Sequence, residues 1–319
     1  MSEWIVGIDL GATYIRIALS KSNGIPEVIE KYRFQKSKSI REEVEQTICK
    51  PLEELLNKND IAAQDVKGIG VATAALFDRD SGDLVSWPNH PLWKGVCLKK
   101  ILENRFRAPV LLEDDANAAA LGEHSMGAAQ GYADFAYITI STGIGCGLIL
   151  GNKLYKGYSG WAGELGHTRI DNCNVQCGCG ARGCLQSVAS GTALIERFRR
   201  YAGQEERYKG ITQLSQISAL AGKGDVLAKD LFKDCANYIG IAIINLSMLL
   251  DLPLVVLGGG VMHEKELLLP HIKKEVEAHI SHLHKHIRIE TAQLKDSSGV
   301  FGVMELVKRE GNLYGSKDK

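Results

Sequence analysis

The chain has 319 residues, 45% of them hydrophobic, which is enough for a substantial core and for two domains of ordinary size. Lysine plus arginine equals aspartate plus glutamate, at 38 each, so no overall positive field exists to hold nucleic acid or an anionic membrane. No apolar run reaches the roughly 20 residues that a membrane-spanning helix needs, and the N-terminal residues lack the basic and apolar stretches of a secretory signal.

The first half of the chain alternates short apolar segments with segments of helical spacing. Two apolar segments flank Gly11-Ala12-Thr13, which predicts a hairpin of two strands joined by a tight turn, and Ser22-Asn23-Gly24 marks a further turn. The alanine-rich segment that begins at Asp115 has an acidic residue where a helix N-cap belongs. The expected elements, in chain order, are strands over Trp4–Leu10 and Ile15–Leu19, a helix over Ser39–Asn57, strands over Val66–Ala75 and Pro109–Leu112, and a helix over Asp115–Met126.

The second half repeats this opening arrangement. Phe135–Thr142 is an expected strand, a Gly/Thr turn follows it, and a further strand runs through Leu150. The later expected elements are a long helix over Asp234–Leu250, a buried strand over Leu254–Leu257 and a helix from about Glu264. Alternating strands and helices indicate α/β layers, and the repeated unit indicates two similar domains. We expect a first domain over residues 1–118, to which the last helix (about residues 299–319) returns, and a second domain over residues 119–298.

Three glycine-containing turns directly follow apolar strands, and together they are typical of polyphosphate binding. Backbone N–H groups in such turns approach phosphate closely because no Cβ intervenes. Thr13 and Thr142 add hydroxyl groups, and Asp9 ends the first strand, where a carboxylate can bind a water of Mg²⁺. Each turn by itself could simply be a tight turn, and neither a Walker motif nor a Rossmann fingerprint is present. The residues predicted to bind ATP and Mg²⁺ are Asp9, Gly11, Ala12, Thr13, Thr142, Gly143, Gly258, Gly259 and Gly260.

Asp115 is the candidate base for the transfer of a phosphoryl group to a hydroxyl. Such a transfer needs a carboxylate that accepts the hydroxyl proton. Asp115 lies in Leu112-Glu113-Asp114-Asp115-Ala116-Asn117, between an expected strand and an expected helix. The alternative is that Asp115 only caps the helix in a solvated acidic turn. Its position at a strand end, like the positions of the glycine turns, favours the catalytic role.

The segment from His167 to Cys184 predicts a structural zinc site. His167, Cys177, Cys179 and Cys184 form a Cys₃His set, and the glycines between them let the loop close tightly around an ion. Free thiols in a flexible loop are the alternative, and no basic or aromatic cluster indicates a zinc knuckle for nucleic acid. Cys173 is an expected spare thiol. The remaining cysteines occur singly, which is typical of a reducing compartment, so we expect a cytoplasmic protein.

Gly163-Glu164-Leu165-Gly166-His167, followed by Cys177-Gly178-Cys179-Gly180-Ala181-Arg182-Gly183-Cys184, is similar to the signature of the ROK family (repressor, open reading frame, kinase) of bacterial sugar kinases and repressors. The resemblance runs from about residue 5 to residue 305. It implies the actin-like ATPase (ribonuclease H-like) fold, in which two α/β domains surround a cleft. It also implies a homodimeric, ATP- and Mg²⁺-dependent hexose kinase that phosphorylates the 6-hydroxyl, with Asp115 as the base.

The resemblance further implies which residues bind the sugar. Glu164 and His167 would bind sugar hydroxyls, and His167 would give its other nitrogen to the zinc. Such a double role is physically sensible because the metal fixes the ring and its tautomer, so that the remaining N–H points at the substrate. The implied sugar-binding residues are Ala75, Asn89, Asp114, Glu164, His167 and Gln186.

Several positions depart from the family pattern. Asp114 replaces an Asn, Gln186 replaces a Glu, and Ala74-Ala75-Leu76 stands where many members have Pro-Gly. The turn Gly11-Ala12-Thr13 also has an alanine where the family usually has a second glycine. The segments most similar to the allose-kinase branch are residues 11–16, 75–77 and 87–92. We therefore expect D-allose as the favoured sugar, with glucokinase and N-acetylmannosamine kinase as the alternatives.

Two functions of other classes remain as alternatives. Sugar-responsive repressors of the same family carry an N-terminal helix-turn-helix of some tens of residues, whereas the first expected strand here begins by Trp4, so we favour the kinase. A sugar-binding protein that has lost catalysis is the other alternative. The presence of Asp9, Asp115 and three glycine turns argues against it.

Overall fold

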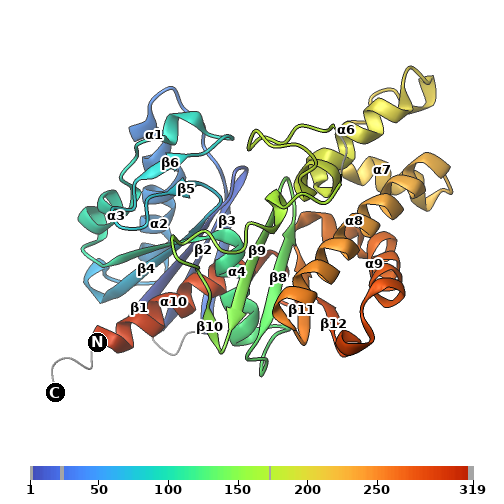
Figure 1. Cartoon of the computed structure of the whole chain (residues 1–319). Coiled ribbons are helices and arrows are strands. Elements are labelled where there is room, and N and C mark those ends of the chain that lie inside the picture. Colours follow the sequence, from blue (N-terminus) through green and yellow to red (C-terminus); the bar gives the residue numbers. More distant parts are fainter. Residues whose placement is uncertain (1–2, 22–24, 172–173, 315–319) are drawn as a thin grey trace. The chain divides into compact units, whose positions relative to one another are not determined.

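The computed structural model describes residues 3–21, 25–171 and 174–314, the last four of them without their side chains (Figure 1). The turn expected at Ser22-Asn23-Gly24 and the expected spare thiol of Cys173 lie outside the described residues. Within the described part of the chain, no helix combines the length and the apolar character that crossing a membrane requires.

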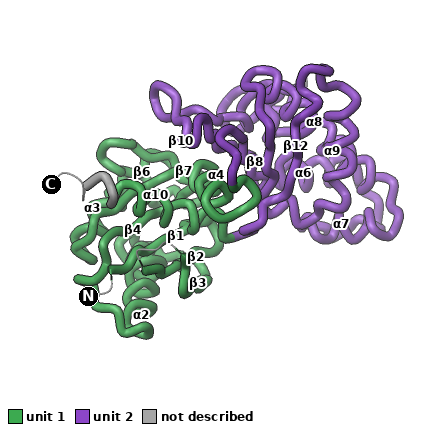
Figure 2. The backbone as a smooth tube through the Cα atoms, turned by 90° about the horizontal axis from the view of Figure 1, so that it is seen from below, with its two compact units in different colours: residues 1–130, 297–319 green, residues 131–296 purple. Residues whose placement is uncertain are grey.

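The chain divides into two compact units (Figure 2). Unit 1 comprises residues 1–130 and 297–319, and unit 2 comprises residues 131–296. The boundary expected from the sequence lies at residue 118, within a helix, whereas the observed division comes after that helix. The reason is that α4 (Asp115–Met126) packs along α10 (Ser298–Tyr314) and so remains in unit 1 over its whole length.

Unit 1 is built on a five-stranded sheet with the order β3-β2-β1-β4-β7. β1 and β2 form the expected antiparallel hairpin, while β1, β4 and β7 run parallel. Their register aligns Leu10, Thr73 and Asp114, so the three parallel strands end together at one edge of the sheet. The strands of unit 1 are β1 (Trp4–Leu10), β2 (Tyr14–Lys21), β3 (Pro26–Arg33), β4 (Val66–Thr73) and β7 (Val110–Asp114), with a separate ribbon of β5 (Leu76–Phe77) and β6 (Leu84–Ser86).

Helices cover both faces of this sheet. On one face, Val300 and Met304 of α10 pack against Ile5 and Ala18. Side chains that alternate with these along the strands point to the other face and join the larger core with α2 and α3. The helices of unit 1 are α1 (Ile40–Val44), α2 (Lys50–Lys58), α3 (Leu98–Phe106), α4 and α10, with a π-helical turn over Glu45–Cys49.

The helix expected over Ser39–Asn57 is present but is interrupted by that π-helical turn. Pro51 lies in the first turn of α2 and has no N–H to donate to the carbonyl four residues earlier. The backbone N–H of Lys50 donates to the carbonyl of Glu45, five residues back, which is the π-type pattern. The proline therefore explains a local widening that apolar spacing alone does not predict.

Two glycines allow α4 and α10 to cross at very short range. A Cβ on Gly302 would overlap the Ala118 carbonyl oxygen, and a Cβ on Gly122 would overlap the Ser298 carbonyl oxygen. Neither oxygen belongs to a flexible side chain that could move aside. The two helices can therefore pack only because both positions lack a side chain.

Unit 2 repeats the sheet topology of unit 1. Its sheet has the order β10-β9-β8-β11-β12, with an antiparallel hairpin of β8 and β9 and a parallel set of β8, β11 and β12. This agrees with the repeat of strand, turn and strand in the sequence. The strands are β8 (Phe135–Ile140), β9 (Ile144–Leu150), β10 (Lys153–Leu154), β11 (Leu254–Gly258) and β12 (Arg288–Thr291).

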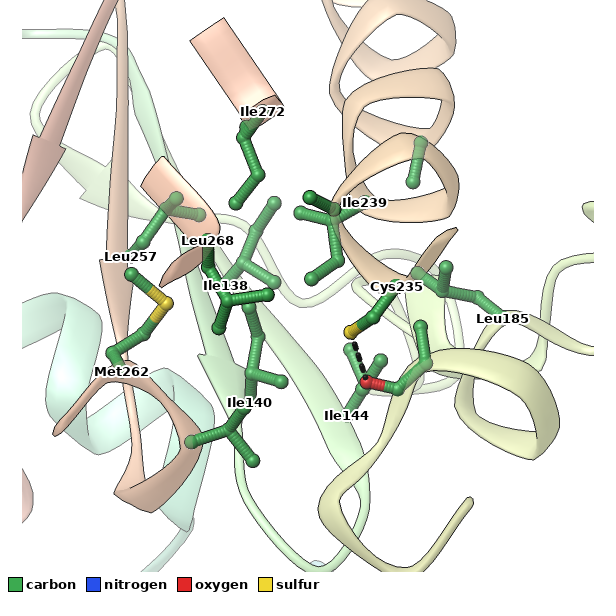
Figure 3. Packing of buried hydrophobic residues seen from close by; sticks show 14 of the residues in the cluster. Ile138, Ile140, Ile144, Leu185, Cys235, Ile239, Leu257, Met262, Leu268 and Ile272 are labelled. Carbon is green, nitrogen blue, oxygen red and sulfur yellow. Dashed lines mark hydrogen bonds between the residues drawn. The ribbon is translucent and has the colours of Figure 1, made fainter. Parts of the chain in front are cut away.

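The core of unit 2 lies between this sheet and its helices. Figure 3 shows Ile138 and Leu257 of the sheet near Ile239 of α8 and Leu268 of α9. The buried thiol of Cys235 donates to the Ala189 carbonyl oxygen at 3.3 Å. The helices are α5 (Leu185–Ala189), α6 (Gly191–Ala202), α7 (Leu214–Gly222), α8 (Val226–Leu250) and α9 (Lys265–His279).

The crossing of α4 and α10 gives a first testable prediction. Gly302→Ala should lower the free energy of unfolding of unit 1 by about 2 kcal/mol or more, because the new methyl group forces the helices apart. Gly222→Ala in α7 is the matched control, since its Cβ would meet no heavy atom within 4 Å, and it should change stability by less than about 1 kcal/mol. Calorimetric unfolding of both variants checks this. Equal unfolding temperatures for the two variants would contradict the account of the crossing.

Candidate functional site

The turn between β1 and β2 lies at the carboxyl edge of the sheet in unit 1. Gly11 is needed there because a Cβ would lie 2.8 Å from the Tyr14 carbonyl oxygen. Asp9 pairs with Arg16 across the hairpin, with 3.2 Å between Asp9 Oδ2 and Arg16 Nη1. The structure thus places the predicted glycine turn directly beside the predicted acidic residue.

His90, which the sequence analysis does not single out, holds this turn in place. Its side chain is buried, stacks on Phe34 with ring centroids 3.9 Å apart, and has Nε2 2.9 Å from the Ala12 carbonyl oxygen. Burial lowers the pKa of His90, which favours the neutral ring, and the tautomer with a proton on Nε2 donates to Ala12. Because the peptide is planar and trans, the Thr13 N–H then points away from His90.

The hydrogen bond from His90 fixes one peptide plane of the turn, and Phe34 fixes the next. The backbone N–H of Phe34 donates to the Thr13 carbonyl oxygen at 2.9 Å. Two successive carbonyl groups are therefore held by the protein. A turn with a fixed backbone can present its N–H groups to an anion without reorganising.

The two predicted sugar-binding residues near His90 and β4 differ in exposure. Asn89 is exposed, as a side chain that meets a substrate must be. Ala75 is 4% exposed and belongs to the hydrophobic core, and its N–H donates to Thr73 Oγ1 at 3.1 Å. The methyl group of Ala75 thus packs against protein, and a contact between this residue and a sugar stays a prediction.

Asp114, and not Asp115, is the N-cap of α4. Asp114 Oδ1 accepts hydrogen bonds from the N–H groups of Ala116 and Asn117, at 3.0 and 3.2 Å. The sequence predicts the acidic cap one residue later, because it contains two adjacent aspartates and its pattern does not show where β7 ends. Since the capping role belongs to Asp114, the capping alternative for Asp115 is wrong. Asp115 is half-buried in the first turn of the helix.

The carboxyl group of Asp114 has an unusual charge state. Burial, followed by the negative charge of Asp115, raises the pKa of Asp114 to about 8. The cap hydrogen bonds oppose this shift but do not cancel it. Near neutral pH, Asp114 therefore holds its proton more readily than an ordinary carboxyl group does. A protonated Asp114 can donate a hydrogen bond as well as accept one.

The two glycine turns of unit 2 lie next to each other at the carboxyl edge of its sheet. β8 and β11 are parallel neighbours, so the segments that follow them, Ser141–Gly143 and Gly258–Gly260, emerge together. Gly259 has φ +87°, and its Cβ would lie 2.5 Å from the Ile140 carbonyl oxygen. The N–H of Gly191, at the start of α6, donates to the Ser141 carbonyl oxygen at 2.7 Å. The structure therefore brings together Thr142, Gly143, Gly258, Gly259 and Gly260.

Gln186 joins the first of these turns to the cysteine-containing loop. Its Oε1 accepts from the N–H of Ile144 at 3.4 Å, and its Nε2 lies 3.5 Å from Cys177 Sγ. A Cβ on Gly143 would lie 3.1 Å from the same Oε1. The family resemblance implies a sugar-binding role for Gln186, and the contacts that the structure gives Gln186 are with the loop and the turn.

The four residues predicted to bind zinc gather in one cluster, with their ligand atoms all within 4.8 Å of one another. His167 Nδ1 lies 3.5 Å from Cys177 Sγ, and the sulfur atoms of Cys179 and Cys184 are 3.8 Å apart. In a tetrahedral zinc site, metal–ligand bond lengths require about 3.6 Å between nitrogen and sulfur and about 3.8 Å between sulfurs. The residues present therefore fit a zinc ion.

The orientation of His167 leaves its second nitrogen available. Nε2 lies 3.8 Å from Glu164 Oε2, on the side of the ring opposite the cysteines. Nδ1 is the atom in the cluster, and Nε2 is the nitrogen nearer the Glu164 carboxylate. The double role that the resemblance implies for His167, with zinc on one nitrogen and a sugar hydroxyl on the other, stays a prediction.

Comparison with known proteins gives a family match over most of the chain. The family model described as ROK family matches residues 5–310. A glucokinase of Halalkalibacterium halodurans is 31% identical over 321 residues, which cover 97% of this chain and 96% of that protein. A xylose repressor of Caldicellulosiruptor bescii is 31% identical over 313 residues, which cover 95% of this chain and 77% of the repressor.

Solved structures give the same relationship. The crystal structure of a ROK family glucokinase from Streptomyces griseus, in complex with glucose and AMPPNP, superposes with a TM-score of 0.81 at 30% identity. The match covers 96% of this chain and 99% of that one. The actin-like ATPase fold expected from the sequence is thereby confirmed.

The raised pKa of Asp114 predicts how stability depends on pH. A carboxyl group whose pKa is higher in the folded state than in the unfolded state stabilises the fold at low pH, and this contribution is lost as pH rises toward 8. Asp114→Asn keeps a good cap without the charge. Its unfolding temperature should therefore exceed that of the parent protein at pH 8.5, and the difference should shrink toward pH 5. Calorimetry measures both unfolding temperatures. If the difference between the unfolding temperatures of Asp114→Asn and the parent protein does not change with pH, the charge state assigned to Asp114 is contradicted.

Proposed function

Because the chain belongs to the ROK family, we propose that it is an ATP-dependent hexose kinase that transfers the γ-phosphoryl group to a sugar hydroxyl. The observation that carries the proposal is the shared carboxyl edge of β1, β4 and β7. Asp9, the Gly11–Thr13 turn and Asp115 all lie at that edge. A phosphate-binding turn, an acid suited to Mg²⁺ and a proton acceptor are what phosphoryl transfer to an alcohol requires.

The glycine turns of each unit are suited to bind phosphate groups. In unit 1, the backbone of Gly11, Ala12 and Thr13 is fixed by His90 and Phe34, so its N–H groups need no rearrangement to meet phosphate oxygens. In unit 2, the adjacent turns after β8 and β11 offer further N–H groups. Asp9 is suited to a water of Mg²⁺. These residues act on the phosphates.

Asp115 acts as the base. It accepts the proton of the attacking hydroxyl as the new O–P bond forms and the bond to ADP breaks. Its neighbour Asp114 carries the cap and, when protonated, can donate to a sugar hydroxyl. In unit 2, Glu164 and the Nε2–H of His167 are suited to hydrogen bonds with other sugar hydroxyls.

The Cys₃His cluster would hold a structural zinc through His167 Nδ1 and the sulfur atoms of Cys177, Cys179 and Cys184. With all four ligands from the protein, such an ion fixes the loop and supplies no chemistry of its own. The loop in turn orients His167. The described cysteines are free thiols, which are typical of a reducing compartment and support the proposal that the protein acts in the cytoplasm.

The proposal also includes the identity of the sugar. The likeness of three segments to allose kinases supports D-allose, phosphorylated at the 6-hydroxyl. Asp114 weighs less in this choice than the sequence suggests, because a protonated carboxyl donates much as the usual Asn does. Glucose and N-acetylmannosamine are the alternative substrates. A homodimer stays a prediction from the family likeness.

A sugar-responsive repressor is the second candidate function. It is supported by the xylose repressor that shares 31% of its residues with this chain over the aligned region. A repressor needs no proton acceptor beside a phosphate-binding turn, so the presence of Asp115 beside the edge of β1 and β4 favours the kinase.

An ADP-release screen tests the kinase proposal. Aldohexoses and their N-acetylamino forms are compared by kcat/KM at saturating Mg²⁺ and ATP, and D-allose should give the highest value. Asp115→Asn should lower kcat by about 100-fold or more while sugar still binds, because it removes only the proton acceptor. Asp80→Asn, in an exposed loop of the same unit, should leave kcat unchanged.

Three outcomes would count against parts of this proposal. If no hexose stimulates ADP release, the kinase assignment fails and the repressor gains support. If Asp115→Asn keeps normal turnover, the base is another group and Asp114 is the next candidate. If glucose gives the highest kcat/KM, only the assignment of D-allose is wrong.

Zinc content gives a separate prediction. The purified protein should contain one zinc per chain, and Cys179→Ser should lower zinc content, unfolding temperature and sugar affinity together, because the loop that orients His167 loses its anchor. Cys97→Ser, at a thiol outside the cluster, should retain the metal. Metal analysis that finds no zinc, together with thiols that all react freely in the native protein, would contradict the site.

A further inference from the structure

Glu113, the residue before the two aspartates at the start of α4, belongs to a buried ion pair. The side chain of Glu113 is 0% exposed, and Arg79 Nη1 donates to its Oε1 at 3.0 Å. Arg79 comes from the segment between β5 and β6, 34 residues away in the sequence, and its guanidinium lies over the Phe77 ring at 5.4 Å. A buried carboxylate is costly unless it is paired in this way.

The same carboxylate oxygen holds the junction between β7 and α4. Glu113 Oε1 also accepts from the backbone N–H of Asp114 and from Asn117 Nδ2, each at 3.1 Å. The acceptor thus joins the last strand residue to the first turn of the helix. Asp115 lies between these two anchored residues, so the direction of its side chain depends on them.

We propose that Arg79 and Glu113 are positioning residues that fix the geometry and set the charge balance of the Asp114–Asp115 pair. This inference rests on the proposed function, because it concerns the group proposed as the base. Neither residue needs to touch the substrate. Glu113 adds a negative charge next to the pair, and Arg79 adds a compensating positive charge behind it.

Other charged groups on the packed elements have partners of their own. Asp9 pairs with Arg16, and on α10 Glu305 pairs with Arg309. Glu123, on α4 itself, accepts from Ser298, and Lys67 is near the opposite end of β4 from Thr73. Arg79 and Glu113 are charged groups that hydrogen bonds join to this junction.

The two residues should shift the ionisation of the aspartate pair in opposite directions. The charge of Glu113 makes ionisation of the pair harder, in agreement with its contribution to the raised pKa of Asp114. The charge of Arg79 makes ionisation easier. Removing Arg79 should therefore move the acid limb of kcat/KM to higher pH, and removing the charge of Glu113 should move it to lower pH, each by about one pH unit.

The experiment compares pH profiles of Arg79→Met, Glu113→Gln and the double variant with the parent enzyme. Glu113→Gln keeps an acceptor oxygen at the junction, and Arg79→Lys keeps the positive charge, so Arg79→Lys should restore most of the parent profile. The double variant should return the acid limb toward that of the parent. Arg197→Met in unit 2 removes another largely buried arginine, which pairs with the exposed Asp234, and should leave the acid limb in place.

An infrared titration of ¹³C-aspartate-labelled protein provides a readout that needs no kinase activity. We expect a carboxyl band that titrates near pH 8 in the parent and is absent from Asp114→Asn. The titration midpoint of this band should shift to higher pH in Arg79→Met and to lower pH in Glu113→Gln. If Arg79→Met does not fold, the expected shift of the titration midpoint to lower pH in Glu113→Gln still tests the proposal. Acid limbs or carboxyl bands that stay within about 0.2 pH units of the parent would overturn the proposal. Absence of kinase activity with a shifted band would overturn only the proposed function.

Discussion

The hydrogen-bonded register of the parallel strands determines where the functional backbone of each unit lies. Leu10, Thr73 and Asp114 stand in line, so the β1–β2 turn and the start of α4 emerge at one level of the sheet. In unit 2, Gly258 pairs with Thr139, and the two glycine turns begin at one level for the same reason. A slip of one residue would turn every side chain of a strand to the opposite face, and the apolar faces of these sheets resist such a slip.

Elements that carry a strong local pattern were predictable from the sequence. β1 begins and ends where its apolar run does, and α4 has the bounds that its alanine-rich composition indicates. β3 was not predicted, because only every second side chain is partly buried and several of the others are charged. The break in the helix before Pro51 shows a different limit, since apolar spacing does not distinguish a π-helical turn from a regular one.

In the candidate site too, local patterns were predictable from the sequence and contacts between distant residues were not. The glycine turns and the Cys₃His set are recognisable because their residues are close in sequence and chemically distinctive. His90 and Ala12 are 78 residues apart, and Arg79 and Glu113 are 34 apart. No periodicity links such positions, so only the folded chain reveals these contacts. The cap of α4 was only partly predictable. The sequence shows the two adjacent aspartates, but which of them caps the helix depends on where β7 ends.

The return of α10 to unit 1 affects how the protein can fold during synthesis. Residues 131–296 are contiguous, so unit 2 can fold once they have left the ribosome. Unit 1 is then still incomplete, with the sheet face around Ile5 and Ala18 uncovered until α10 is made. At a typical rate of chain elongation, this exposure lasts on the order of ten seconds. During that time the nascent chain presents an open apolar surface, which is the kind of surface that chaperones bind.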